Sequence, residues 1–237
     1  MPGPVRRRTT QVTVLRHYSG RSLLPRHRHL SAYAAVVLAG DFVEAGDRGR
    51  HRLEPGKVVF HRPFEAHRDE FGPTGAVVLD LPLSCCPSFT TGEVDALDGL
   101  VRLADRDPEA AAVLLLDQVR PAEAELADWP DVLARALASE RETSLTAWAG
   151  RHGLTVQAVS RGFRQTYGTT AKRFRAEHRA QRAVHALPGW TGTLAGLAAE
   201  VGFVDQAHLT RAIVSLTGSP PGRLRAKWIQ DRSRIAG

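Results

Sequence analysis

The sequence predicts an α+β protein of several domains: a small all-β domain, a helical connector, and an all-α domain with two helix-turn-helix units. Three observations lead to this fold class. Short apolar stretches between Gly, Pro and Asp fill residues 12–83, which is typical of strands joined by tight turns. From about residue 93 the apolar residues recur with a helical period. Beyond residue 139 the chain repeats itself at an offset of 49 to 50 residues, which indicates one structural unit used twice.

Size and composition place the chain among folded proteins and exclude a membrane protein. The 237 residues provide enough chain for two cores, and no apolar run approaches the ~20 residues that a bilayer crossing needs. The basic residues 1–9 lack the apolar stretch of a signal peptide. Cys85 and Cys86 are neighbours, and adjacent cysteines rarely reach disulfide geometry. We therefore expect a cytoplasmic protein, in which these cysteines are either small apolar residues at a domain edge or soft-metal or redox groups.

The positive charge belongs to the C-terminal part of the chain. Residues 139–237 hold 15 Lys and Arg against 6 Asp and Glu, whereas residues 1–138 hold 17 against 19. An excess of this kind indicates a polyanionic partner. Charge alone also fits a solvated basic surface without a partner.

Residues 1–90 are predicted to form the all-β domain, and its histidines are the candidate ligand-binding residues. His27 and His29 lie two residues apart, so on a strand both side chains point to one face. His67, from a later hairpin, can meet them inside a small barrel. Three imidazoles are a competent ligand set for zinc, iron or manganese. His61 is expected to face another way in its strand.

Residues 91–138 are predicted to form an acidic helical connector. Leu97, Leu100, Val101 and Ala104 recur at helical spacing, and Pro108 suits the first position of a second helix. We expect either a dimerisation element or a linker packed on the first domain.

Residues 139–237 form the all-α domain, in which each repeat has the pattern of helix, glycine turn and helix. Gly153 and Gly202 lie in the two turns, where a glycine tolerates a backbone that other residues avoid. Thr155 and Asp205 are predicted N-caps of the second helices. A longer helix from about Ala171 is expected to join the units and to stop at Pro188-Gly189.

The second helix of each unit presents side chains suited to a DNA major groove. Arg can pair with guanine, Gln with adenine, and Ser with either. Because one stiff helix joins the units, the two reading helices should lie about one turn of DNA apart. The predicted DNA-binding residues are Gln157, Ser160, Arg161 and Arg164 in the first unit and Gln206, Ala207, His208, Thr210 and Arg211 in the second.

Residues 139–230 resemble the DNA-binding domain of AraC/XylS-type transcription regulators. The resemblance rests on the run Ala198-Ala199-Glu200-Val201-Gly202-Phe203-Val204-Asp205-Gln206 and on Gly218-Ser219-Pro220-Pro221. It implies two helix-turn-helix units joined by a long helix. It also implies base reading at Gln157, Ser160, Arg161, Gln206, Ala207, Thr210 and Arg211. Leu209 and Ile213 stand where aromatic residues are common, and Val204 and Ala207 replace polar positions, so we expect the second unit to read fewer bases.

The first domain resembles the cupin barrels. Gly20, His27, His29, Tyr33 and Gly40 match one cupin motif, and Pro55-Gly56 with Pro63 and His67 match the other. Tyr33 stands where metal-binding cupins have a glutamate ligand, which excludes their full set of three histidines and one glutamate. The resemblance leaves open a divalent metal site, a metal-free ligand pocket that includes Tyr33, and histidines with a structural role.

Together these features predict a sequence-specific DNA-binding transcription regulator whose cupin-like domain senses a small molecule or a metal. The expected partners are double-stranded DNA, a small-molecule effector, a second copy of the chain and the transcription machinery. A cupin-type metalloenzyme fused to a DNA-binding module is the main alternative, and a nonspecific architectural DNA-binding protein is another. We find no catalytic triad or phosphate-binding glycine loop and therefore predict no enzymatic activity.

Overall fold

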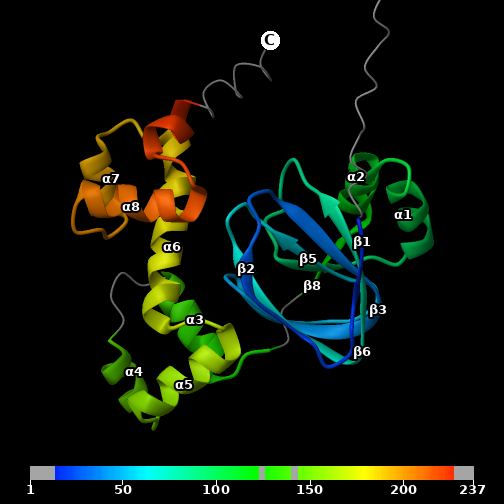
Figure 1. Cartoon of the computed structure of the whole chain (residues 1–237), viewed down its shortest axis with the longest axis horizontal. Coiled ribbons are helices and arrows are strands. Elements are labelled where there is room, and N and C mark those ends of the chain that lie inside the picture. Colours follow the sequence, from blue (N-terminus) through cyan, green and yellow to red (C-terminus); the bar gives the residue numbers. More distant parts are fainter. Residues whose placement is uncertain (1–13, 123–125, 140–143, 227–237) are drawn as a thin grey trace, which may run out of the picture.

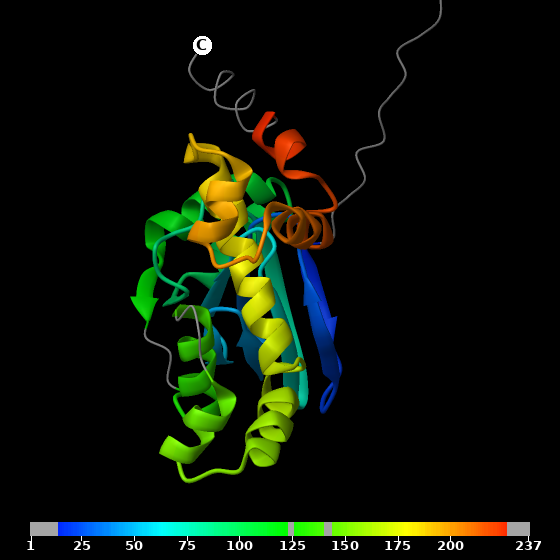
Figure 2. The ribbon, with the colours of Figure 1, turned by 90° about the vertical axis from the view of Figure 1, so that its left-hand side faces the viewer.

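The computed structural model describes residues 14–122, 126–139 and 144–226. A β-domain lies beside a column of helices (Figure 1), and in the view turned by 90° the helices form a layer in front of the sheet (Figure 2). No described helix has the length and apolar character needed to cross a membrane. The N-terminal segment that bears on the signal-peptide prediction lies outside the described residues.

The β-domain is one antiparallel sheet that curves into a barrel-like body (Figure 1). Two long strands organise it, because β6 pairs with β3 along most of its length, with β1 and β2 on its other side. Along its other edge, β3 pairs with β4 and β5. The sheet then continues from β5 to β7 and from β7 to β8. The strands are β1 Leu15–Tyr18, β2 Leu23–Arg28, β3 Tyr33–Gly46, β4 Gly49–Leu53, β5 Lys57–His61, β6 Ala66–Pro82, β7 Thr91–Glu93 and β8 Arg120–Ala122.

A bulge in β3 decides which of its side chains face the interior of the barrel. Between Val37 and Ala39 the register against β6 shifts by one residue. Such a shift reverses the alternation of faces along a strand. Gly40 follows with a φ of +71°, and a Cβ there would lie 1.8 Å from the carbonyl oxygen of Gly75. As a result, residues an odd number of positions apart, Tyr33 and Glu44, line the same interior pocket.

The predicted connector divides between the two halves of the molecule. Helices α1 (Leu97–Ala104) and α2 (Pro108–Gln118) pack on the outer face of the sheet. The side chain of Asp107 caps α2 and Pro108 is its first residue, as predicted. Helix α3 (Trp129–Ser139) instead joins the core of the first helix-turn-helix unit.

The last third contains two helical units joined by one long helix, as the repeat predicts. Thr155 and Asp205 cap the second helix of each unit, and Gly153 and Gly202 take left-handed backbones with φ of +65° and +82°. Each unit has its own buried core. The helices are α4 Leu145–Arg151, α5 Val156–Tyr167, α6 Ala171–Ala186, α7 Leu194–Glu200 and α8 Gln206–Thr217, with a short 3₁₀ turn η1 Leu187–Gly189 after α6.

Candidate functional site

The two predicted reading helices keep their polar faces in solvent while the β-domain is docked. On α5 the buried residues Val159 and Phe163 fix the helix against its unit, and Leu209 and Ile213 do the same on α8. The opposite faces carry the predicted DNA-binding residues. Gln157, Ser160, Arg161, Arg164, Gln206, Ala207, His208 and Arg211 are exposed, and Thr210 is half-buried.

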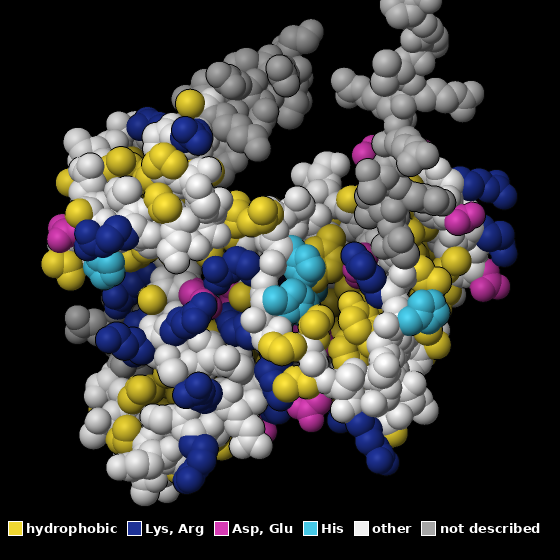
Figure 3. All heavy atoms as spheres, in the orientation of Figure 1, with side chains coloured by type: hydrophobic (Ala, Val, Ile, Leu, Met, Phe, Trp, Pro, Cys, Tyr) yellow, Lys and Arg dark blue, Asp and Glu magenta, His cyan; other side chains and the backbone are white. Residues whose placement is uncertain are grey.

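The interior of the β-domain holds a pocket that opens to solvent. Figure 3 shows histidines and hydrophobic side chains at this opening, with Lys and Arg spread over the helical part beside it. The hollow spans about 460 Å³ with the solvent at its mouth included. Its polar lining is His27, His29, Tyr33, Glu44, His61, His67, Asp69, Asp80 and Arg16, and its apolar lining includes Leu24, Phe42, Phe71 and Val78.

The structure brings His27, His29 and His67 together as the sequence pattern suggests. One ring nitrogen from each lies within 4.8 Å of the others. Nδ1 of His27 lies 3.0 Å from the Pro25 carbonyl, and Nδ1 of His67 lies 2.9 Å from Asp69 Oδ1. Contacts of this kind fix the other ring nitrogen of a metal-binding histidine toward the ion. The donor set and its supporting contacts therefore fit a divalent metal.

Tyr33 occupies part of the same space. Its hydroxyl lies 3.0 Å from Nε2 of His67, the nitrogen that a metal would use. Its ring stacks on His61 with the centroids 4.5 Å apart. A bound ion would replace the contact between Tyr33 and His67, whereas a metal-free ligand would find a ring and a hydroxyl ready to bind it.

The prediction that His61 faces another way is wrong. His61 pairs with Tyr33 across β5 and β3, its side chain is buried, and its ring centroid lies 4.5 Å from that of His67. Strand β5 is buried on both faces, so its residue pattern contains no alternation that could orient His61.

Sequence reasoning also missed a buried carboxylate in the pocket. Glu44 Oε2 lies 3.3 Å from Nε2 of His61 and 3.4 Å from Nδ1 of His67, and these three residues form a second group that could hold a metal. Tyr33 does replace the usual glutamate at its own position, but Glu44 supplies a carboxylate from further along the same strand. The bulge in β3 hides this from the sequence, because it changes which residues share a face.

The buried charges of the pocket stabilise each other. Burial by itself lowers the pKa of His67, but the carboxylates of Glu44 and Asp69 outweigh it and raise this pKa to about 9. Burial raises the pKa of Glu44, and the facing His61 and His67 overcome that and lower it to about 2. His29 has no such carboxylate contact, and burial together with the neighbouring histidines lowers its pKa to about 4.

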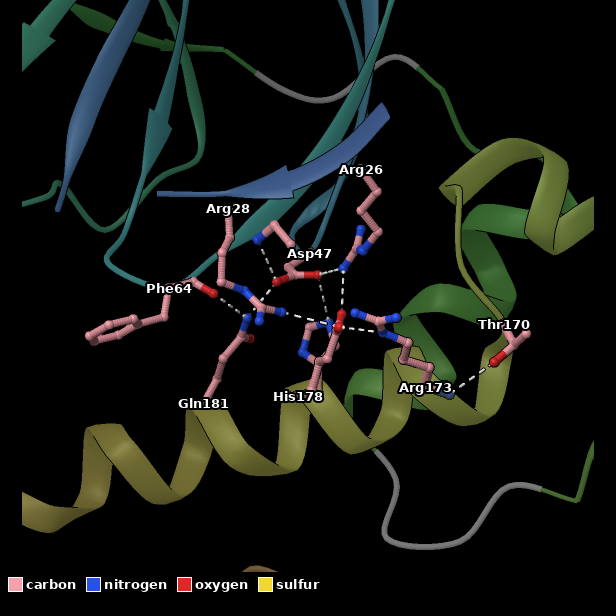
Figure 4. Close-up of polar contacts among 10 residues, drawn as sticks. Arg26, Arg28, Asp47, Phe64, Thr170, Arg173, His178 and Gln181 are labelled. Carbon is pink, nitrogen blue, oxygen red and sulfur yellow. Dashed lines mark hydrogen bonds and ion pairs between the residues drawn. The ribbon is translucent and has the colours of Figure 1, made fainter. Parts of the chain in front are cut away.

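Strand β2 connects this pocket to the helical part. Its residues alternate, so that His27 lines the pocket while Arg26 and Arg28 face α6. Arg26 binds Asp47 and also donates to Glu177 of α6 at 3.2 Å. Figure 4 shows this cluster between the β-domain and α6.

Helix α6 completes the same cluster from its side. The amide of Gln181 donates to Asp47 and, at 3.0 Å, to the Phe64 carbonyl. Burial raises the pKa of Asp47, but the Arg26 guanidinium, His178 and two hydrogen bonds outweigh it and lower this pKa. Asp47 is therefore a buried anion shared by both halves of the molecule.

A second set of contacts ties the β-domain to the first helix-turn-helix unit. Arg50 of β4 donates to both carboxylate oxygens of Asp131 in α3, at 3.2 and 2.9 Å. The Tyr167 hydroxyl of α5 donates to the same carboxylate at 2.8 Å. Arg68 of β6 donates to the Thr166 carbonyl at 3.3 Å.

Comparison with known proteins identifies the helical part. Residues 148–227 match a family model described as a helix-turn-helix domain. This part of the chain is therefore a helix-turn-helix domain, as the repeat in the sequence predicts. The match begins within α4 and covers α5, α6, α7 and α8, so it includes the second helix of both units and the helix that joins them. The family evidence points to a regulator rather than an enzyme.

Solved structures with similar parts include several regulators. The C-terminal domain of AraT, a response regulator from Geobacillus stearothermophilus, is 18% identical with a TM-score of 0.40, covering 44% of this chain and 88% of that one. An AraC-type regulator from Chromobacterium violaceum is 22% identical with a TM-score of 0.37, covering 41% and 88%. An apo variant of ToxT from Vibrio cholerae is 7% identical with a TM-score of 0.39, covering 88% and 94%. No curated protein matches the chain.

Proposed function

We propose that the chain is an AraC-type transcription regulator that reads a specific operator with α5 and α8, and that a ligand in the histidine pocket changes how it does so. The carrying observation is the pair of exposed polar faces on α5 and α8, which the same long helix holds in one domain. A cytoplasmic location, a second copy of the chain and the transcription machinery belong to this proposal as the setting and partners of such a regulator.

The two reading faces have the chemistry of base recognition. Arg161 and Arg211 occupy the same position in the two units, and each can bind a guanine edge with two hydrogen bonds. Gln157 and Gln206 lie near the start of their helices, where recognition helices contact bases. A nonspecific architectural protein has no need of such side chains at these positions.

The pocket is the ligand-sensing part of the proposal. It combines three clustered imidazoles, a buried carboxylate and an aromatic hydroxyl inside an apolar wall. His27, His29 and His67 would hold a divalent zinc, iron or manganese ion, which would add charge and cross-link β2 to β6. A small organic effector would instead bind against Tyr33 and the apolar lining.

Strand β2 provides the connection between ligand and DNA. A ligand that pulls on His27 and His29 also moves the backbone that carries Arg26 and Arg28, which hold Glu177 of α6. A ligand shifts an equilibrium only if its affinity differs between two states. We propose that these two states are α6 docked on the β-domain and α6 released from it.

Selection of binding sites from random duplex DNA tests the DNA-reading part. The full chain should select two short blocks about one helical turn apart at a fixed salt concentration. An Arg161→Ala, Arg211→Ala double variant should lose preference within both blocks. The matched control replaces two exposed arginines of the β-domain, Arg102 and Arg106, by alanine and should select the wild-type site. Selection of no sequence by the wild-type chain would contradict the proposal.

Metal binding separates the alternatives for the pocket. Zinc, manganese and ferrous ions would be titrated into the purified chain, into a His27→Ala, His29→Ala variant, and into a His17→Ala control, whose exposed histidine lies on β1. Stoichiometric binding lost only in the double variant assigns the metal site. No binding removes the metalloenzyme alternative, since that enzyme requires a metal, and leaves an organic ligand or a structural role for the histidines.

A further inference from the structure

Val204 is exposed in a way that nothing else in its unit explains. Its side chain is 88% exposed, and it directly precedes Asp205, the N-cap of the reading helix α8. It is the most exposed of the large hydrophobic residues in the described part of the chain. An exposed valine can bury its apolar surface only on contact with a partner.

The turns of the two units begin in the same way. The backbone N–H of Leu154 donates to the Ala149 carbonyl at 2.9 Å, and that of Phe203 donates to the Ala198 carbonyl at 2.8 Å. Both Leu154 and Phe203 pack against the core of their own unit. These corresponding residues lie 49 positions apart in the sequence.

The turns then end differently, because the second one contains an additional residue. Thr155 caps α5 and Asp205 caps α8 by accepting the N–H three residues on, and these two caps lie 50 positions apart. Thr155 follows Leu154 directly, whereas Val204 lies between Phe203 and Asp205. Val204 is therefore an insertion with no counterpart in the first unit, placed at the groove-reading end of α8.

The neighbouring side chain has the same apolar character. Ala207 is exposed, and its counterpart 50 positions earlier is Gln157 on α5. At Ala207 the first turn of α8 thus presents a methyl group where α5 presents an amide, next to the exposed amide of Gln206. Further along α8, Arg211 occupies the position that corresponds to Arg161 on α5, and both arginines are exposed. The apolar end is therefore part of a surface that otherwise retains the chemistry of base reading.

We propose that Val204 is a specificity-determining residue that contacts the C5-methyl group of a thymine, beside Ala207. The methyl group of thymine is the apolar feature of the major groove, and the N-terminal residues of a recognition helix are those that reach base edges. The two units then differ in chemistry: α5 reads through hydrogen bonds, whereas the start of α8 adds an apolar contact to the hydrogen bonds of Gln206 and Arg211. This inference rests on the proposed DNA-reading function.

The test removes the methyl group from the DNA and the side chain from the protein. In the selected site, each thymine of the α8 block is replaced in turn by uracil, which keeps base pairing and lacks the methyl group. For the wild-type full chain, one replacement should weaken binding about fourfold, equivalent to the ~0.8 kcal/mol of one buried methylene-sized group. For Val204→Ala, the same replacement should leave the affinity unchanged, and its own affinity for thymine DNA should be lower by a similar factor.

The control is Val113→Ala, which truncates another exposed valine, on α2 of the β-domain. It should respond to uracil as the wild type does. An equal response to uracil in Val204→Ala and the wild type overturns the inference, and so does a site in which no thymine methyl matters. If Val204→Ala binds DNA normally and instead lowers transcription in a purified system, Val204 contacts a protein. Failure of the wild type to select any sequence overturns the regulator proposal itself, whereas the other outcomes leave it standing.

Discussion

The two helix-turn-helix units differ in how they attach to the β-domain. Ala45 of β3 packs inside the core of the first unit, and Arg50 and Arg68 bind its polar groups. Among the described residues, the corresponding contact to the core of the second unit comes from Phe64, which packs against it.

The attachment of the second unit also carries strain. Phe64 takes a left-handed backbone with a φ of +69°, a conformation that costs a residue with a Cβ about 1–2 kcal/mol. Its carbonyl accepts a hydrogen bond from Gln181, so the strained residue is held by α6. The first unit is therefore held to the β-domain by a buried residue inside its core and by polar contacts, whereas the core of the second unit meets the β-domain through Phe64.

The largest expected effect comes from breaking the attachment of the first unit. Asp131→Ala removes the acceptor of both Arg50 and Tyr167 from a site where Asp131 is 1% exposed. Arg50 keeps its ion pair with Asp128 at 2.8 Å, but Arg50 and the buried Tyr167 hydroxyl each lose a hydrogen bond to a charged group, at about 1.5–3 kcal/mol apiece. We expect a much lower thermal midpoint, followed by tryptophan fluorescence, because Trp129 and Trp148 pack in this core. Asp98→Ala, on an exposed face of α1, should stay close to wild type.

The next effect concerns α6, the element that both units share. Arg26→Met leaves Asp47 without its arginine and removes one of the arginines that bind Glu177, so it should weaken docking by about 1.5–3 kcal/mol, the usual loss for a hydrogen bond to a charged group. Hydrogen exchange should rise along α6 and β2 while the interior of the β-domain stays protected. The comparison variant is Arg106→Ala, which is exposed. Unchanged exchange along α6 would contradict a docking role for β2.

Single arginine variants compare the two units on DNA. Arg161→Ala and Arg211→Ala should each weaken binding by about 1–3 kcal/mol and relax preference at one base of their own block. Because the units read separate blocks, the two losses should add in the double variant. A uniform loss on all sequences would instead show that these arginines bind phosphate.

The smallest expected effect is a pH dependence at Asp47. The pKa of Asp47 is lowered in the fold, because Arg26, His178 and its hydrogen bonds outweigh burial. The resulting stabilisation is present above the ordinary pKa of 3.8 and is lost as the pH falls below it through the lower folded value. The Asp47→Asn variant lacks this stabilisation at every pH, because an amide does not ionise. The difference in unfolding free energy between the two proteins should therefore shrink on acidification below pH 3.8, and a constant difference would refute the assignment.

What the sequence determined by itself is mostly local. The caps Thr155 and Asp205, the turn glycines Gly153 and Gly202, and the start of α2 at Pro108 all follow from interactions within a few residues. The repeat and its exposed faces follow from helical periodicity, which depends on nothing outside the helix. The approach of His27 and His29 to one another follows from their spacing of two residues, although His29 lies just beyond the end of β2.

The tertiary structure alone decided the rest of the pocket and the whole interface. Glu44 joins the pocket through a bulge, and His61 joins it from a strand buried on both faces, so the residue pattern orients neither. Asp47 and Gln181 are 134 residues apart and meet because α6 docks on the β-domain. Local patterns encode which face of an element is apolar. Which elements meet, and which polar groups are buried together, depends on chain reversals and register shifts that bring distant segments into contact.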